Sequence, residues 1–385
     1  MSARDGRPAK VVVWRDYWLA PSETFIRDQV ASLQRWQPVT VGRRQFSRTL
    51  VTADHAPYGD SLAGRVLSLL PPAPQVSRGY RDVFADPEVA VVHAHFGPDG
   101  VRALRHARRA GKPLLVTFHG MDVTALPNRR WAGRRYRRQL TALFAGAHTL
   151  IAVSEFIAGQ LEALGAPREK IAVHYIGTDV PAARQAAAER RGILFVGRLV
   201  EKKGVADLFR AVADLPGELA RTPVTVVGYG PLRAQLEQRA AETGVDARFL
   251  GRRSSAEISD LLAQHAVFCA PSRRAADGDS EGFGMVFLEA AAAELPVASY
   301  RHGGIGEAVV DGTTGLLADE GDVAGLSAAL RTLLTDPDLA RRLGRAGRER
   351  VVAEFDVRER TAELEKLYDA AAAQSLVEVG DRAGA

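Results

Sequence analysis

Two glutamates eight residues apart, Glu281 and Glu289, are the side chains of this sequence best placed to do chemistry. Glu281 lies in a loop of small and acidic residues, and Glu289 lies about one turn into a segment with helical apolar spacing. Helical side chains lean toward the N-terminus, so we expect Glu289 to point back at the loop. Carboxylates accept hydrogen bonds from sugar hydroxyls, and a helix N-terminus favours phosphate. The stretch therefore favours a nucleotide sugar, although its spacing is equally typical of a capped helix with two solvated glutamates.

The segment from Glu281 to Glu289, EGFGMVFLE, resembles the Glu-x7-Glu motif of retaining family-4 glycosyltransferases, which have the GT-B fold. The longer string ADGDSEG…EA…PV…GG…E resembles the subgroup that builds bacterial exopolysaccharides such as colanic acid. This resemblance implies that Glu281 binds a hydroxyl of the donor sugar and that Glu289 binds the ribose. It also implies donor contacts along the segment between them, which comprises Gly282, Phe283, Gly284, Met285 and Val286. The sequence departs from the subgroup at Gly306, where the subgroup commonly has proline. Glycine makes the loop backbone more flexible than proline does, so a role of Glu307 is less secure.

Two cations, Arg198 and Lys203, lie in a loop that follows an apolar run at residues 192–197. At the end of a strand they can neutralise the charge that develops on a diphosphate leaving group. A lone arginine or lysine is more often solvated surface charge. Gly197, Arg198 and Lys203 together resemble the diphosphate-binding residues of the family, so we interpret both cations as catalytic.

His119 ends the apolar run PLLVTFH. A histidine in such a position is ordinarily a core residue bonded to the backbone. The string TFHGMD, however, resembles that around the family's histidine beside the donor sugar, where it stabilises the charge that builds during transfer. We therefore place His119 with Glu281, Arg198 and Lys203 among the catalytic candidates.

Three further residues are candidates for the acceptor side: Glu23, His95 and Asp122. Glu23 belongs to the string SETFI, which resembles a string of the exopolysaccharide subgroup near the cleft. It precedes an expected helix over residues 24–36, which Ser22 can cap. His95 ends another apolar run, and we expect it to line the acceptor side.

A metal site is an alternative for some of these residues. His93 and His95 share one face of an expected strand, near His119 and Asp122, but the sequence establishes no third convergent ligand. The string DGD at 277–279 matches the Asp-x-Asp metal signature of the other large glycosyltransferase fold, but so short a pattern occurs often by chance. The family does not depend on a catalytic metal. We expect no metal and no cofactor, with a UDP- or GDP-linked sugar as co-substrate.

Six arginines lie between Arg129 and Arg138, together with Trp131 and Tyr136. A helix with this pattern suits the surface of an anionic membrane or a phosphate-bearing acceptor. It is equally typical of a solvated helix whose tyrosine packs inward. Residues 1–180 carry 25 Lys and Arg against 15 Asp and Glu, so an anionic partner is expected for this half. Nucleic acid is not expected, because no recognition module accompanies the charge.

The composition, 46% hydrophobic over 385 residues, fits a globular protein of two domains. No run approaches the 18 or more apolar residues of a membrane span, and the first apolar stretch is too short for a signal peptide. The single cysteine, Cys269, excludes an internal disulfide. We expect a cytoplasmic protein and leave open peripheral contact with the inner face of the cell membrane.

Apolar runs alternate with helical patterns, which indicates an α/β protein with parallel, doubly wound sheets. The alternation restarts near residue 192, so we expect two Rossmann-like domains facing each other across a cleft, the GT-B fold. We assign residues 1–177 to acceptor binding and residues 178–357 to nucleotide-sugar binding. The family implies that a last helix, within residues 358–385, crosses back to the first domain, and we expect a frayed tail after about Ala373.

The resemblance implies a retaining transferase that moves a sugar from a nucleotide sugar to a hydroxyl and forms an α-glycoside. The acceptor can be a saccharide, a lipid-linked saccharide or a small polar natural product. Two alternatives share the fold and the ligand. A sugar-nucleotide epimerase of the GT-B type would convert the donor without an acceptor, and a non-catalytic nucleotide-sugar-binding protein would turn nothing over.

Overall fold

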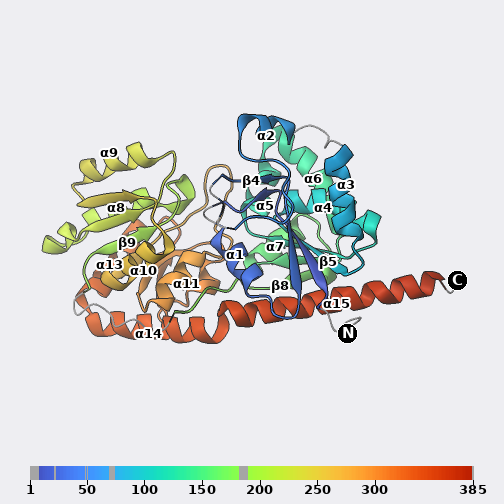
Figure 1. The fold of residues 1–385 in the computed structure, drawn as a ribbon. Helices are drawn as coiled ribbons and strands as arrows, with labels where there is room; N and C mark the ends of the chain where they lie inside the picture. The colour runs from blue at the N-terminus through green and yellow to red at the C-terminus, as the bar shows by residue number, and fades with distance from the viewer. Residues whose placement is uncertain are drawn as a thin grey trace. The chain divides into compact units, whose positions relative to one another are not determined.

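The computed structural model describes residues 8–20, 23–47, 49, 51–68, 74–181 and 190–383, without the side chains of residues 74–76 and 375–383. The chain forms two compact units. The first comprises Met1–Gly177 and Val357–Ala385, and the second comprises Thr178–Asp356. Each unit contains a six-stranded parallel sheet (Figure 1), so the expected α/β class with two Rossmann-like sheets is confirmed. In these described ranges, no helix is long and apolar enough to cross a bilayer.

The sheet of the first unit has the strand order β3-β1-β5-β6-β7-β8. In that order its strands are Gln37–Val41, Lys10–Trp14, Val89–His95, Leu114–Phe118, Thr149–Ala152 and Ile171–Val173. The strands are parallel and read as nearly unbroken apolar runs, as expected where helices cover both faces. The order reverses at β1, so the carboxyl ends of β1 and β5 form the switch point where such sheets bind ligands.

The other elements of the first unit surround this sheet. Its helices are α1 (Thr24–Ala31), α2 (Leu62–Leu67), α3 (Pro74–Ala85), α4 (Gly97–Ala110), α5 (Met121–Thr124), α6 (Arg130–Gly146) and α7 (Glu155–Ala163). Two short strands, β2 (Tyr17–Trp18) and β4 (Arg44–Gln45), pair in a separate small sheet.

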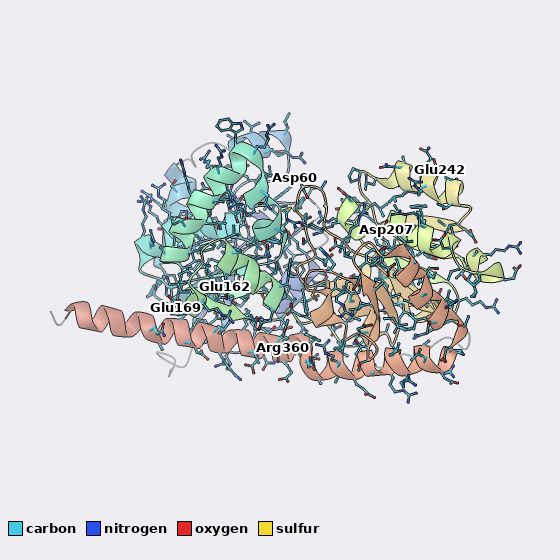
Figure 2. All side chains as sticks on the ribbon, turned by 180° about the vertical axis from the view of Figure 1, so that it is seen from behind. Asp60, Glu162, Glu169, Asp207, Glu242 and Arg360 are labelled. Atoms are coloured by element: carbon cyan, nitrogen blue, oxygen red, sulfur yellow. The ribbon has the colours of Figure 1, made fainter. Side chains whose placement is uncertain are left out.

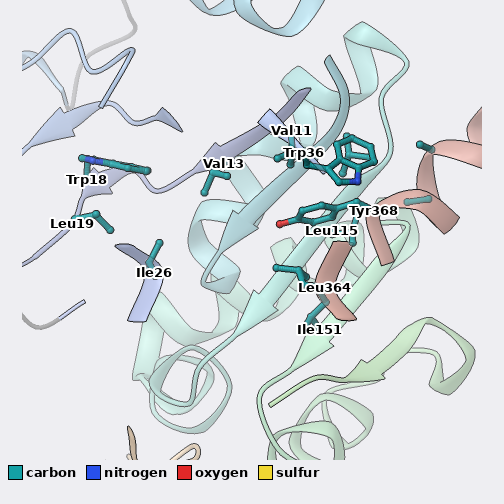
Figure 3. Close-up of a cluster of buried hydrophobic side chains, with 13 residues drawn as sticks. Val11, Val13, Trp18, Leu19, Ile26, Trp36, Leu115, Ile151, Leu364 and Tyr368 are labelled. Carbon is teal, nitrogen blue, oxygen red and sulfur yellow. The ribbon is translucent and has the colours of Figure 1, made fainter. Parts of the chain in front are cut away.

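The last helix, α15 (Val357–Ala383), belongs to the first unit and packs on its sheet. Leu364 and Tyr368 of α15 are 1% exposed and share one buried cluster with Val11, Leu115 and Ile151 (Figure 3). The helix therefore supplies part of the apolar core of a unit whose other residues, Met1–Gly177, come before the whole second unit in the sequence.

Polar contacts also tie α15 to the first unit. Glu365 is 1% exposed, and its Oε1 accepts the backbone N–H groups of residues 34–36 at 2.7–3.1 Å. The ring of His174 donates from Nε2 to the carbonyl oxygen of Arg360 at 2.7 Å. Arg360 lies near the start of α15 (Figure 2). A buried carboxylate is stable here because three N–H groups replace its hydration.

These contacts explain one error of the sequence analysis. We expected a helix over residues 24–36, but α1 ends at Ala31. The N–H groups of residues 34–36 bond to Glu365 instead of continuing the helix. The proposed cap, Ser22, lies outside the described residues. We also expected a frayed tail after about Ala373; α15 extends to Ala383, and the fraying stays a prediction.

The second unit has the strand order β11-β10-β9-β12-β13-β14. In that order its strands are Ala247–Gly251, Val224–Val227, Ile193–Val196, Val267–Cys269, Val297–Arg301 and Gly315–Asp319. Its helices are α8 (Val205–Ala213), α9 (Arg233–Thr243), α10 (Ser255–Gln264), α11 (Met285–Ala292), α12 (Ile305–Ala308), α13 (Val323–Thr335) and α14 (Pro337–Glu354). This is the order of dinucleotide-binding sheets, with the switch point between β9 and β12.

Candidate functional site

The loops that follow β9 and β12 hold the predicted donor-binding residues at the switch point of the second unit. The two loops lie backbone against backbone at Gly204, where a Cβ would collide with the carbonyl oxygen of Pro271. Gly204 has a φ of 64°, and only glycine accepts both that angle and this approach easily. The close packing brings Lys203 of the β9 loop next to Glu281 of the β12 loop.

An ion pair joins Nζ of Lys203 to Oε2 of Glu281, and both side chains are 12% exposed. The hydroxyl of Ser272 donates to the same carboxylate oxygen at 3.4 Å. Burial alone would raise the pKa of Glu281, but the charge of Lys203 and of neighbouring cations lowers it to about 2. Glu281 is therefore ionised at neutral pH and acts only as a hydrogen-bond acceptor. The sequence did not indicate that these two predicted residues pair with each other.

Lys202, which sequence reasoning missed, stabilises the same loop. This residue is 7% exposed, and its Nζ lies 3.0 Å from Oδ1 of Asp279 and 3.4 Å from the carbonyl oxygen of Ser280. In turn, Oδ1 of Asp277 accepts the backbone N–H of Asp279 at 3.0 Å. Both carboxylates of the DGD string thus hold the loop that leads to Glu281.

Arg198 differs from the two lysines because it is exposed. No residue in the described part of the chain forms an ion pair with its guanidinium. Its charge still contributes to the lowered pKa of Glu281. Arg198 is therefore the cation of this loop that can neutralise an incoming anion without first breaking an ion pair.

The helix α11 begins directly after the loop of Glu281. Its N-cap is Gly284, with a φ of 90°, and a Cβ there would lie 2.5 Å from the ring of Phe287. Glycine offers the first-turn N–H groups no side-chain acceptor, an arrangement typical of helix N-termini that bind phosphate. Glu289 lies in the second turn and is half-buried, and the intervening Phe283 is buried.

The loop after β13 holds Glu281 from the other side. The N–H of Gly304 donates to the carbonyl oxygen of Glu281 at 3.0 Å. A Cβ at Gly303 would collide with that same oxygen, and a Cβ at Gly304 would collide with the carbonyl oxygen of Gly282. The glycine pair therefore lets two backbones meet. The structure thus brings together every predicted donor-site residue from Gly197 to Glu289 around one edge of one sheet.

In the first unit, His119 and His95 lie together at the carboxyl ends of β6 and β5. Nδ1 of His95 is 3.2 Å from Nε2 of His119, so one ring donates to the other. The His119 ring also packs on Phe25 and Phe96, at centroid distances of 5.0 and 4.4 Å. Burial, together with the charge of Arg15, lowers the pKa of His119 to about 3. His119 is therefore a neutral imidazole at physiological pH.

Glu23, an acceptor-side candidate, is the N-cap residue of α1 and pairs with Arg15 at 2.8 Å. The guanidinium of Arg15 also binds Asp99 at 2.7 Å and lies 4.5 Å from the centre of the Phe96 ring. The carboxylate of Glu23 additionally accepts the N–H of Ala20 at 3.0 Å. Glu23 thus orders the loop after β1 at the switch point of the first unit.

Asp122, the third acceptor-side candidate, lies in the interior of the first unit. Asp122 is fully buried, and its carboxylate accepts the backbone N–H groups of Gly97 and Gly120 at 3.0 and 2.9 Å and that of His119 at 3.2 Å. It therefore joins the start of α4 to the loop that carries His119. These hydrogen bonds hold the loop against the start of α4.

His93 shares a face of β5 with His95, as the spacing indicated, with ring centres 4.4 Å apart. Both of its ring nitrogens have partners, the hydroxyl of Tyr368 at 2.6 Å and that of Thr117 at 2.7 Å. These contacts argue against His93 as a metal ligand. Over all the described ranges, no group of three or more His, Cys, Asp or Glu side chains could hold a metal ion.

The arginine-rich segment forms the start of α6, with Arg129 as its N-cap residue. Tyr136 packs inward and is 8% exposed, whereas Trp131 is 84% exposed. The helix packs against α4, and the two helices expose a set of arginines: Arg105, Arg108, Arg109, Arg130, Arg134, Arg135 and Arg138. α6 contains no acidic residue, so this surface is strongly cationic.

Comparison with known proteins decides the family. Residues 23–181 match the family model described as "Glycosyltransferase Family 4", and residues 179–350 match "Glycosyl transferases group 1". The chain is 32% identical, over 93% of its length, to 88% of the "Putative colanic acid biosynthesis glycosyltransferase WcaL" of Escherichia coli. The chain belongs to the family-4 glycosyltransferases. The resemblance inferred from the two glutamates is thereby confirmed.

This glycosyltransferase also resembles a second sequence relative and a protein of known structure. It is 32% identical, over 78% of its length, to 81% of a "GDP-mannose-dependent alpha-(1-6)-phosphatidylinositol monomannoside mannosyltransferase" of Mycolicibacterium smegmatis. Its fold matches that of Anabaena Alr3699/HepE, solved in complex with UDP and glucose, with a TM-score of 0.75 and 19% identity. That match covers 94% of this chain and 100% of the other, and it confirms the GT-B fold.

Proposed function

We propose that this glycosyltransferase binds a UDP- or GDP-linked sugar at the carboxyl ends of β9 and β12. One observation carries the proposal: an ionised, largely buried Glu281 beside Lys203, Arg198 and the N-terminus of α11. The carboxylate suits sugar hydroxyls, and the positive groups suit a diphosphate. A mannosyltransferase relative is named for GDP-mannose, and a structural neighbour was solved with UDP, so both bases fit the proposal.

Each residue has a separate task in this account. Arg198 and the N-terminus of α11 bind the diphosphate, and Glu289 binds the ribose. Glu281 accepts hydrogen bonds from the donor sugar, while Lys203 keeps it ionised and stabilises the leaving group. His119 acts as a neutral hydrogen-bonding group, because burial keeps its pKa near 3. No catalytic metal or other cofactor is required.

The reaction we propose retains the configuration of the sugar. A hydroxyl of the acceptor attacks the anomeric carbon on the face from which the nucleoside diphosphate leaves, and its proton passes to the departing phosphate oxygen. An α-linked donor thereby forms an α-glycoside. Proton NMR of the first product, recorded before further transfer, tests this proposal through the anomeric signal of the new glycoside. A β-glycoside would contradict retention, and conversion of the donor in the absence of an acceptor would indicate an epimerase instead.

The acceptor we propose is a saccharide, a lipid-linked saccharide or a small polar natural product. Relatives named for colanic acid and for a phosphatidylinositol mannoside support a glycan or lipid-linked acceptor. We propose that the enzyme acts in the cytoplasm and contacts the anionic inner face of the membrane through the α4–α6 arginines and Trp131.

Charge removal from α6 tests this membrane contact. Replacing Arg130, Arg134 and Arg135 by glutamine should weaken binding to vesicles of anionic phospholipid about 100-fold, since each basic residue near such a surface contributes about 1 kcal/mol. Co-sedimentation with vesicles measures the effect. A matched control removes three exposed arginines of α14, namely Arg341, Arg342 and Arg345, and should leave binding unchanged. Equal binding by the α6 variant and the wild type would refute the contact.

A further inference from the structure

His302, in the loop after β13, connects two acidic residues of the second unit. Its side chain is 6% exposed. Nδ1 lies 2.7 Å from Oε2 of Glu320, and Nε2 lies 3.4 Å from the backbone N of Glu281. A carboxylate only accepts and a backbone N–H only donates, so these partners select one neutral tautomer. His302 donates from Nδ1 and accepts at Nε2.

The segment from His302 to Gly304 thereby holds both backbone polar groups of Glu281. The N–H of Glu281 donates to the imidazole, and its carbonyl oxygen accepts the N–H of Gly304 at 3.0 Å. Gly303, with a φ of 56°, lies so close to that oxygen that no side chain fits. The backbone position of Glu281 is therefore set from the β13 loop, while its carboxylate is held by Lys203 of the β9 loop.

The carboxylate of Glu320 is held in place by hydrogen bonds to both of its oxygens. It follows directly after β14, and its second oxygen, Oε1, accepts the backbone N–H of Arg274 at 2.7 Å. Arg274 belongs to the loop that follows β12 and leads to Glu281. One imidazole and one carboxylate thus tie together the loops at the carboxyl ends of three neighbouring strands, β12, β13 and β14.

We propose that His302, oriented by Glu320, is a positioning residue for Glu281 in sugar transfer. The inference rests on the proposed donor-sugar role of Glu281. A group that binds the reacting sugar must be held within about half an ångström of its productive position, and hydrogen bonds from supporting residues provide that precision. Loss of the Nε2 acceptor leaves the Glu281 N–H without its bond and lets the loop shift.

Two substitutions separate the two halves of this contact. In His302→Asn, the side-chain N–H₂ takes the place of Nδ1 and keeps the bond to Glu320, but no acceptor remains for Glu281. In His302→Gln, the longer amide places its oxygen near the position of Nε2 and keeps that acceptor. We expect kcat/KM to fall about 10- to 100-fold in the first variant, by analogy with the loss of residues that support metal ligands. In the second, we expect it to stay within about threefold of wild type.

Activity is expressed per folded molecule, with melting temperatures recorded for both variants. Wild-type kcat/KM in His302→Asn, or a loss that only follows the folded fraction, would overturn the proposal. The imidazole ¹⁵N shifts of the wild type give a readout that needs no turnover. A protonated Nδ1 with a bare Nε2 is expected, and the opposite tautomer would overturn the inference. Should the wild type transfer no sugar, the proposed function fails, and the tautomer still tests the geometry.

Discussion

Replacing Lys203 by methionine is expected to lower kcat/KM for sugar transfer about 10²- to 10³-fold, the usual effect of removing one electrostatic contact to a reacting group. Methionine preserves much of the length of the side chain and removes its charge. Glu281 then lacks its closest cation in a site where both side chains are 12% exposed. Steady-state kinetics with a saturating acceptor measure the loss. Lys203→Arg, which keeps the charge, should recover part of the rate, and wild-type activity in Lys203→Met would contradict the assignment.

The same substitution should change how stability depends on pH. The pKa of Glu281 is about 2 in the folded protein and 4.5 for an ordinary glutamate, so its ion pair contributes stability above about pH 4.5. That contribution is lost as pH falls from 4.5 toward 2. Without Lys203 the folded pKa rises, because burial then dominates. Lys203→Met should therefore be less stable than wild type at pH 7, by about 3–5 kcal/mol, and the difference should shrink in acid. An equal difference in stability between the two proteins at pH 7 and in acid would contradict the ion pair.

Replacing Tyr368 of α15 by alanine is expected to destabilise the first unit by about 3–5 kcal/mol. Tyr368 is 1% exposed, packs edge-on against Trp36 at 5.5 Å, and hydrogen-bonds to His93. Its loss leaves a cavity between the helix and the sheet. Tyr368→Phe keeps the ring and loses only the hydroxyl contact, so it should cost about 1 kcal/mol.

Tryptophan fluorescence during urea unfolding measures both effects selectively. All four tryptophans, Trp14, Trp18, Trp36 and Trp131, belong to the first unit, so the signal reports that unit alone. The midpoint should fall strongly for the alanine variant and slightly for the phenylalanine variant. Equal midpoints for all three proteins would show that α15 does not stabilise the first unit.

Local pattern was sufficient to predict most strands and helices, whereas the family resemblance was needed to select the residues of the candidate site. Buried parallel strands read as apolar runs, and residues that follow such runs must lie at one sheet edge. Arg198, Lys203 and Glu281 follow such runs, and the structure gathers them at one edge of one sheet. The motif from Glu281 to Glu289 indicated the family, since its spacing spans a loop and the first turns of one helix.

Contacts between distant segments could not be read from local pattern. In the sequence, Asp122 looks like a polar residue that could bind a ligand. In the structure, its buried carboxylate accepts three backbone N–H groups. Residues 34–36 look helical, but Glu365, some 330 positions away, takes their N–H groups. His302 has no sequence signal beyond its place before the glycine pair, because its partners come from two other loops. Such pairings depend on which loops meet, and periodicity carries no information on that.

The measurement that tests the central claim most directly is the melting temperature of the protein with a panel of nucleotides and nucleotide sugars, for wild type and Glu289→Ala. A ligand that binds only the folded state stabilises it by about 2.7 kcal/mol at a hundred times its Kd. The account predicts that UDP or GDP compounds raise the melting temperature of the wild type and that the shift is largely lost in Glu289→Ala. If no nucleotide shifts the wild type, the donor site at β9 and β12 is contradicted.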